Sequence, residues 1–83
     1  MKLLYFAWLR TRLGVGEECV SPPAEVATVA DLIAWLRTRG PQWQAALADL
    51  AKLRVAVNQD YVAFDHPVRA GDEVALFPPV TGG

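Results

Sequence analysis

The chain has 83 residues, a formal net charge of −1, one cysteine and one histidine. This length accommodates one small domain over residues 1–83, and a hydrophobic fraction of 53% excludes a chain that is disordered overall. A single cysteine excludes an internal disulfide bond, Cys19 and His66 are too few for a Cys/His zinc site, and a net charge near zero argues against binding nucleic acid.

The longest apolar run covers residues 3–9, whereas a transmembrane helix needs about 20 residues. Arg10 and Arg12 follow this run and no small-residue cleavage site appears, so the segment does not resemble a signal peptide. A free cysteine is typical of a reducing compartment. We therefore expect a soluble, cytoplasmic protein with no membrane contact.

Residues 2–9 are rich in aromatic and aliphatic side chains, which predicts a first strand. Its side chains alternate between two apolar sets: Leu3, Tyr5 and Ala7, and then Leu4, Phe6 and Trp8. Such a strand is either central in its sheet or contacts a partner with its second face. Residues 10–16 contain two glycines and predict a loop, and residues 17–20 predict a short second strand.

The clearest predicted helix covers residues 28–39. Thr28 is a good N-cap residue, and Asp31 completes a pattern close to a capping box. Apolar side chains then fall on one side at helical spacing: Leu32, Ile33 and Leu36. Gly40-Pro41 ends the helix.

The second half of the chain predicts a further short helix and then strands. Residues 41–50 contain good helix formers. Residues 53–58 alternate as a half-buried strand does, residues 61–64 predict a short returning strand after a turn, and residues 73–77 predict the last strand. Pro78-Pro79 then prevents further strand pairing.

This order of elements predicts an α+β fold in which one main helix packs on one face of a sheet. One helix cannot cover both faces, so the other face should carry a patch of large apolar groups drawn from Phe6, Trp8, Tyr61 and Phe77. A patch of this kind on a small protein is typical of a partner-binding surface. The alternative is a two-sided core that the short helix and loops complete.

Few side chains in this sequence suggest chemistry of their own. His66 lies between Asp65 and Pro67 with no evident nucleophile or acid beside it, which favours a structural turn residue. Glu17 and Glu18 would raise the pKa of the Cys19 thiol, which favours an unreactive cysteine. No metal site and no phosphate-binding glycine loop is expected.

The end of the sequence is its most distinctive feature. Two prolines stiffen the exit from the last strand, and Gly82 and Gly83 carry no side chains, so they could enter a channel that any Cβ atom would block. The reactive group would then be the carboxylate of Gly83. The alternative is an ordinary frayed terminus. We expect residues 78–83 to form a flexible tail.

Five stretches carry a more specific pattern: Leu4-Tyr5-Phe6-Ala7 with Arg10, Ala56-Val57-Asn58-Gln59, Phe64-Asp65-His66-Pro67, Gly71-Asp72-Glu73-Val74-Ala75, and Phe77-Pro78-Pro79-Val80-Thr81-Gly82-Gly83. Together they resemble the MoaD branch of the MoaD/ThiS family of sulfur carriers, the small subunits of molybdopterin synthases. The resemblance spans essentially the whole chain. It implies the ubiquitin-like β-grasp fold, in which a mixed sheet has one main helix packed on one face.

The resemblance also implies a chemical role. In this family an E1-like adenylating enzyme uses ATP to convert the terminal glycine carboxylate to an acyl-adenylate, and a sulfur donor displaces AMP to leave a thiocarboxylate. The large synthase subunit then uses that sulfur to build the dithiolene of molybdopterin from cyclic pyranopterin monophosphate, within a heterotetramer. The chain would be a non-catalytic co-substrate of the large subunit and would bind no cofactor itself.

Site residues follow by position in the family pattern. Gly83 would carry the sulfur, and the preceding tail residues would occupy the partner's channel: Pro79, Val80, Thr81 and Gly82. Partner contacts would involve Phe6, Arg10, Tyr61 and Phe77. Alternatives are a sulfur carrier for thiazole or another thio-cofactor, and a ubiquitin-like protein modifier or binding module. Cys19 and residues 41–52 match no functional motif.

Overall fold

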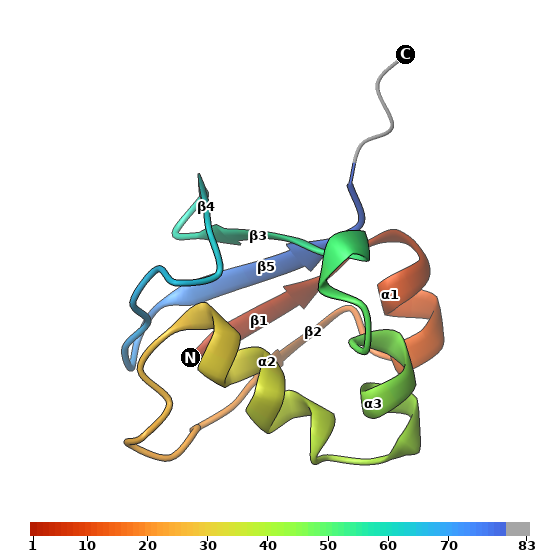
Figure 1. The fold of residues 1–83 in the computed structure, drawn as a ribbon, viewed down its shortest axis with the longest axis horizontal. Coiled ribbons are helices and arrows are strands. Elements are labelled where there is room, and N and C mark those ends of the chain that lie inside the picture. The colour runs from red at the N-terminus through yellow and green to blue at the C-terminus, as the bar shows by residue number, and fades with distance from the viewer. Residues whose placement is uncertain (80–83) are drawn as a thin grey trace.

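In the computed structural model, residues 1–79 are described, so the predictions for Val80, Thr81, Gly82 and Gly83 lie outside the described residues. The described chain forms one five-stranded sheet in the order β2-β1-β5-β3-β4 (Figure 1). The strands are β1 (Lys2–Tyr5), β2 (Glu17–Cys19), β3 (Arg54–Val57), β4 (Asp60–Val62) and β5 (Glu73–Phe77).

The sheet is mixed. The central strands β1 and β5 run parallel, and every other neighbouring pair is antiparallel. Because β1 and β5 are parallel, both end at the same edge of the sheet, where Tyr5 lies opposite Leu76. The chain leaves β5 at this edge (Figure 1).

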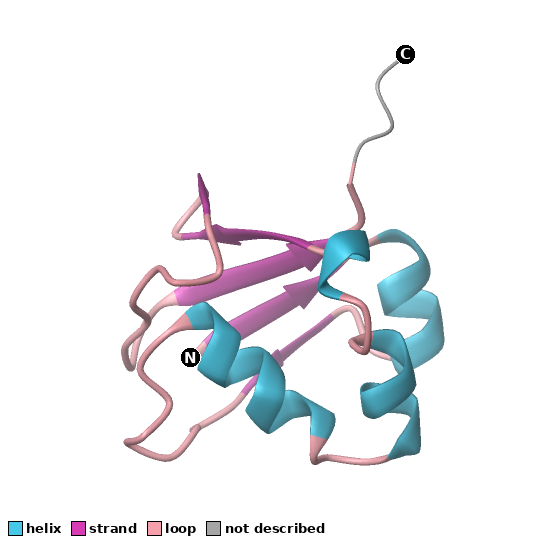
Figure 2. Cartoon of the chain, in the orientation of Figure 1, coloured by secondary structure: helices cyan, strands magenta, loops and turns pink. Residues whose placement is uncertain are grey.

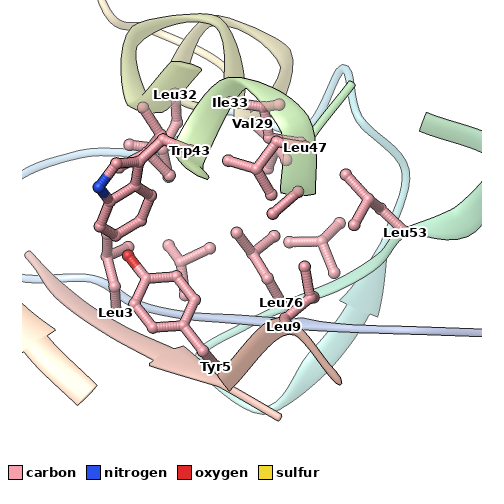
Figure 3. Close-up of a cluster of buried hydrophobic side chains, with 14 of the residues drawn as sticks. Leu3, Tyr5, Leu9, Val29, Leu32, Ile33, Trp43, Leu47, Leu53 and Leu76 are labelled. Atoms are coloured by element: carbon pink, nitrogen blue, oxygen red, sulfur yellow. The ribbon is translucent and has the colours of Figure 1, made fainter. Parts of the chain in front are cut away.

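The helices lie together on one face of the sheet (Figure 2). They are α1 (Ala7–Leu13), α2 (Val29–Arg37), α3 (Pro41–Ala46) and the short 3₁₀ helix η1 (Leu50–Lys52). Between helices and sheet lies a single apolar cluster (Figure 3). Its fully buried members include Leu3, Tyr5, Leu9, Val29, Leu32, Ile33, Leu36, Leu47, Leu53, Val74 and Leu76. The predicted α+β class is confirmed.

The predicted helix over residues 28–39 is confirmed as α2. The Thr28 hydroxyl accepts the Asp31 backbone N–H at 3.2 Å, and the Asp31 carboxylate accepts the Thr28 N–H at the same distance, which completes the capping box. The second predicted helix, over residues 41–50, is divided into α3 and η1. The remaining predicted strands are present within one or two residues of the expected bounds.

The prediction of a strand through residue 9 and a loop over residues 10–16 is wrong. β1 ends at Tyr5, and Ala7 takes a left-handed conformation with φ of 54° that turns the chain into α1. Leu9 and Leu13, one helical turn apart, then pack into the core. Gly14, with φ of 76°, ends the helix. An unbroken apolar run suits both a strand and the first turn of a helix, so sequence periodicity alone does not separate them.

Candidate functional site

The face of the sheet that the helices leave open carries the outward side chains of the central strands. Across this face Leu4 lies opposite Ala75, Ala75 opposite Ala56, and Ala56 opposite Tyr61. The row is formed by small or apolar groups, because strand alternation sends their larger neighbours into the core. This confirms the expected apolar character of the second face. Within residues 1–79 the helices lie on the opposite face, so the short helix does not close over this one.

Aromatic side chains stand at one end of this open face. Tyr61 is 81% exposed and Phe6 is 48% exposed, although both are large and apolar in body. The rings of Tyr61 and Phe77 contact each other with centroids 5.4 Å apart. With Gln59, Ala56 and Ala75 they line a shallow hollow of about 380 Å³. An exposed aromatic cluster around a hollow is the usual composition of a binding hot spot.

Arg10 lies beside this cluster, in a neighbouring hollow that it lines together with Leu4 and Phe6. Its side chain lies against Gly16, because a Cβ atom placed there would come within 3.0 Å of the Arg10 Nε atom. The structure therefore brings Phe6, Arg10, Tyr61 and Phe77 to one region of the surface. Trp8 is an exception to the predicted patch, because it lies on α1 and not on the open face.

The exit of the tail adjoins the same region. Phe77 is the last residue of β5, and Pro78 and Pro79 carry the chain out of the sheet. Pro79 is the only predicted channel residue within the described range. The open face, the aromatic cluster and the start of the tail are therefore contiguous.

Other side chains with possible chemistry take structural positions. Cys19 is exposed on the edge strand β2. The His66 carbonyl accepts the Val29 N–H at 3.0 Å at the start of α2. Across residues 1–79, His, Cys, Asp and Glu side chains form no group of three or more that could hold a metal ion. Within the same residues no helix is both long and apolar enough to cross a membrane.

A half-buried polar network, not predicted from the sequence, ties the sheet to the helices. The Arg39 guanidinium donates to both carboxylate oxygens of Glu18, at 2.8 and 3.0 Å, and the Tyr5 hydroxyl donates to the same carboxylate at 2.8 Å. Arg39 also lies over the Trp43 ring, 4.3 Å from its centroid. The hydrogen bonds from Arg39 lower the pKa of Glu18, and burial raises the pKa of Tyr5. This cluster lies on the helical side, so we assign it to stability.

Gln59 was also missed as a member of the site. It follows Asn58 in the turn between β3 and β4, and both residues have positive φ, 51° for Asn58 and 73° for Gln59. The sequence predicts a turn at Asn58-Gln59 and includes this pair in the family pattern, but assigns Gln59 no role in the site. The turn conformation directs the chain so that Gln59 lines the hollow beside Tyr61.

Comparison with known proteins places this arrangement in a wider group. The ThiS family matches residues 3–83. The chain is 46% identical to the molybdopterin synthase sulfur carrier subunit of Escherichia coli K12 over 83 residues, which is 100% of this chain and 99% of that protein.

Solved structures are similar as well. The Haloferax volcanii small archaeal modifier protein 1 matches with a TM-score of 0.68 and 27% identity, covering 96% of this chain and 97% of that one. The complex of subunits 1 and 2 of the molybdopterin-converting factor from Helicobacter pylori includes a chain that matches with a TM-score of 0.64 over 99% of this chain and 96% of that one. Its identity is 19%, so this second likeness concerns the fold alone.

Proposed function

This chain belongs to the ThiS family and has its ubiquitin-like β-grasp fold, and we propose that it is the sulfur carrier subunit of a molybdopterin synthase. The observation that carries the proposal is the 46% identity to a sulfur carrier subunit over the full length of both chains. The aromatic cluster adjoins the start of the tail, which supports the proposal, because a carrier must present its tail beside the surface that its partner contacts.

The reactive group in this proposal is the α-carboxylate of Gly83. A carboxylate is a poor electrophile, since its charge is delocalised and it has no good leaving group. Adenylation by an E1-like enzyme forms a C–O–P linkage from the carboxylate and ATP and releases pyrophosphate. A persulfide sulfur then attacks the acyl carbon, AMP departs, and reduction of the S–S bond by a thiol leaves a thiocarboxylate on Gly83. ATP is consumed on the activating enzyme, and this chain binds no cofactor.

The second partner is the large, catalytic subunit of the synthase, with two copies of each chain in a heterotetramer. Pro79, Val80, Thr81 and Gly82 lie in its channel, and the thiocarboxylate sulfur attacks cyclic pyranopterin monophosphate there. This chain acts as a co-substrate and contributes no catalytic side chain.

The open face is the surface that both partners, the E1-like enzyme and the large synthase subunit, contact. Burial of Phe6, Tyr61 and Phe77 removes exposed aromatic surface from water, which favours association by about 25 cal/mol for each square ångström buried. Arg10 lies at the rim of that surface, where a charge sets orientation more than affinity. The cytoplasm, where ATP and reducing conditions meet, is the location that this chemistry requires.

Intact-protein mass spectrometry tests the proposal. Protein purified from its own cells should include a species in which one oxygen atom is replaced by one sulfur atom, located at Gly83 by fragmentation. A Gly83-deleted chain should unfold at the same temperature as the natural chain and support no molybdopterin formation with the large subunit. Full activity of the deleted chain would overturn the assignment.

The likeness to small archaeal modifier protein 1 favours a second candidate, a protein modifier that forms isopeptide bonds through the same glycine. The two functions share adenylation and differ in the acceptor. Conjugates on lysine side chains, without any thiocarboxylate, would favour the modifier. A thiocarboxylate that the large synthase subunit cannot use, but a thiazole-forming enzyme can, would favour the thiazole pathway.

A further inference from the structure

A second surface feature lies on the helical side of the tail exit. There α1, η1 and the end of β5 enclose an open cleft of about 450 Å³. Its lining includes Trp8 and Arg12 from α1, Lys52 from η1, and Pro78 and Pro79 at the start of the tail. In Figure 1 η1 and α1 flank the point where the chain leaves the sheet. The open aromatic face described above does not include this cleft.

The two cations of the cleft, Arg12 and Lys52, are available to bind an acidic group. Arg12 lies one helical turn after Trp8, with its guanidinium carbon 5.2 Å from the centre of the indole ring. Lys52 is exposed, and no carboxylate lines the cleft. Among residues 1–79 the ion pairs are formed by Lys2 and Arg39, so neither Arg12 nor Lys52 is neutralised by a described neighbour.

Two further arginines extend this charge around the tail. Arg54 lies opposite Phe77, the last residue of β5, and Arg10 lies beside Phe6. We call Arg10, Arg12, Lys52 and Arg54 the basic collar. Two carboxylates lie near the collar. Glu17 lines the Arg10 hollow and pairs with Lys2 at 3.5 Å, and Asp49 accepts the Ala51 backbone N–H at 3.0 Å and caps η1.

Carboxylates gather at the other end of the sheet. Asp72 and Glu73 stand at the start of β5, and Asp60 is paired to Val57, whose other neighbour is Val74. A strand rises about 3.3 Å per residue, so the two ends of β5 lie about 13 Å apart. Lys2, opposite Glu73, and Arg69, whose backbone N–H Asp72 accepts, also lie at that far end, so it carries charges of both signs, whereas the lining of the cleft beside the tail exit holds cations and no carboxylate.

We propose that the basic collar docks on a protein surface whose carboxylates surround the opening that receives the tail, with one acidic side chain seated between Arg12 and Lys52 against Trp8. This inference rests on the proposed function for the identity of the receiving protein. The cations of the cleft favour encounters in which the tail leads, because they attract a carboxylate surface over long range. Nucleic acid is the poorer occupant, since four cations form only a small phosphate footprint.

The cleft can be tested without any enzyme. A short polyglutamate peptide is titrated at low salt into the isotopically labelled chain and followed by NMR. The Trp8 indole N–H and the Lys52 amide should shift, while the Arg69 amide, at the far end of the sheet, should not. Shifts spread equally over all cations, or absent from Trp8, would overturn the proposal. A single-stranded oligonucleotide of equal charge that shifts Trp8 more strongly would overturn the choice of a carboxylate partner.

Association kinetics with the large synthase subunit complete the test. Lys52→Glu and Arg69→Glu form a matched pair, because both replace an exposed cation and change the net charge equally. Lys52→Glu should slow association by about tenfold at low salt and flatten its dependence on ionic strength, whereas Arg69→Glu should leave the rate within about twofold. Equal slowing by both variants would overturn the collar. If the natural chain fails to bind this subunit while polyglutamate still shifts Trp8, the proposed function fails and the collar stands.

Discussion

At the scale of single residues, the turn between β3 and β4 carries a cost in stability. Its two residues, Asn58 and Gln59, both have positive φ, as a type I′ hairpin turn requires, and glycine is preferred at the second position. Both ends of the Asn58 side-chain amide are hydrogen-bonded: its oxygen accepts the Glu73 N–H at 3.0 Å, and its nitrogen donates to the Asp72 carboxylate at 3.1 Å. Gln59 is in a strained conformation while its side chain lines the aromatic hollow.

We predict that Gln59→Gly raises the free energy of unfolding by about 1 kcal/mol, because glycine removes the left-handed penalty of a Cβ atom. Asn58→Gly is the matched control in the same turn, and it should lower that free energy because two side-chain hydrogen bonds are lost. Urea denaturation of both variants measures the difference. Destabilisation by Gln59→Gly comparable to that by Asn58→Gly would show that the left-handed conformation is not costly.

At the scale of elements, α1 is the segment that connects both surfaces around the tail. It begins directly after Phe6 of the aromatic cluster, and it carries Arg10 and the cleft residues Trp8 and Arg12. Within α1 itself the buried side chains are Leu9 and Leu13. The positions of three functional candidates therefore depend on how these two leucines pack.

We predict that Leu9→Ala lowers the free energy of unfolding by about 2–5 kcal/mol, because Leu9 is fully buried and its truncation leaves a cavity beneath α1. Thr11→Ala on the exposed side of the same helix is the control and should change stability by less than about 0.5 kcal/mol. Chemical denaturation monitored by circular dichroism gives both values. Similar effects of the two substitutions would mean that α1 does not depend on its buried face.

At the scale of the whole molecule, the Tyr5–Glu18–Arg39 network joins β1, β2 and the segment after α2, and it makes stability depend on pH. Glu18 has a lowered pKa when folded, so its contribution is complete above its ordinary value of 4.5 and is lost as pH falls through the lower folded value. Tyr5 has a raised pKa, so its contribution is complete below its ordinary value of 10.0 and declines as pH rises beyond it.

Asp72 acts in the same direction as Glu18 on the acid side. Desolvation raises the pKa of Asp72, but hydrogen bonds from the Arg69 backbone N–H and the Asn58 side chain outweigh it, so the net shift is downward. The acid loss of stability therefore has contributions from the edge strand β2 and from the start of β5. On the alkaline side Tyr5 contributes first, and the pKa of Arg39, raised by its hydrogen bonds to Glu18, adds a contribution at still higher pH.

We predict a plateau of stability between about pH 5 and pH 10, with losses on both sides. Tyr5→Phe keeps the packing of the ring and removes the titrating hydroxyl, so it should reduce the loss above pH 10 while leaving the acid limb in place. Glu18→Gln should reduce the acid limb, with a lower plateau because the charge-assisted bonds to Arg39 are weakened. Urea denaturation midpoints measured across the pH range give the loss of stability on the acid and alkaline sides. An unchanged alkaline loss in Tyr5→Phe would exclude Tyr5 as its cause.

The structure also shows which inferences a single sequence supports. The bounds of α2, the alternation in β3 and β5, and the turn at Asn58 follow from neighbouring residues, because capping, periodicity and turn conformation are local. α1 could not be assigned in this way. The helix begins where Ala7 takes a left-handed conformation, and its register is set by the packing of Leu9 and Leu13 in the core. An apolar run alone does not encode either feature.

The patterning of residues along the chain predicts the fold class, the two-faced sheet and, through its last residues, the family and the proposed chemistry at Gly83. The folded chain was needed to show that Arg10 lies beside the predicted cluster of Phe6, Tyr61 and Phe77. It was also needed to show that Trp8 lies outside this cluster, and that Lys52 and Arg12 line one cleft at the tail exit. These positions depend on strand pairing over long sequence separations. The parallel contact of β1 with β5 joins residues 71 positions apart, the antiparallel contact of β5 with β3 joins residues 17 to 23 positions apart, and these contacts form only when the whole core closes.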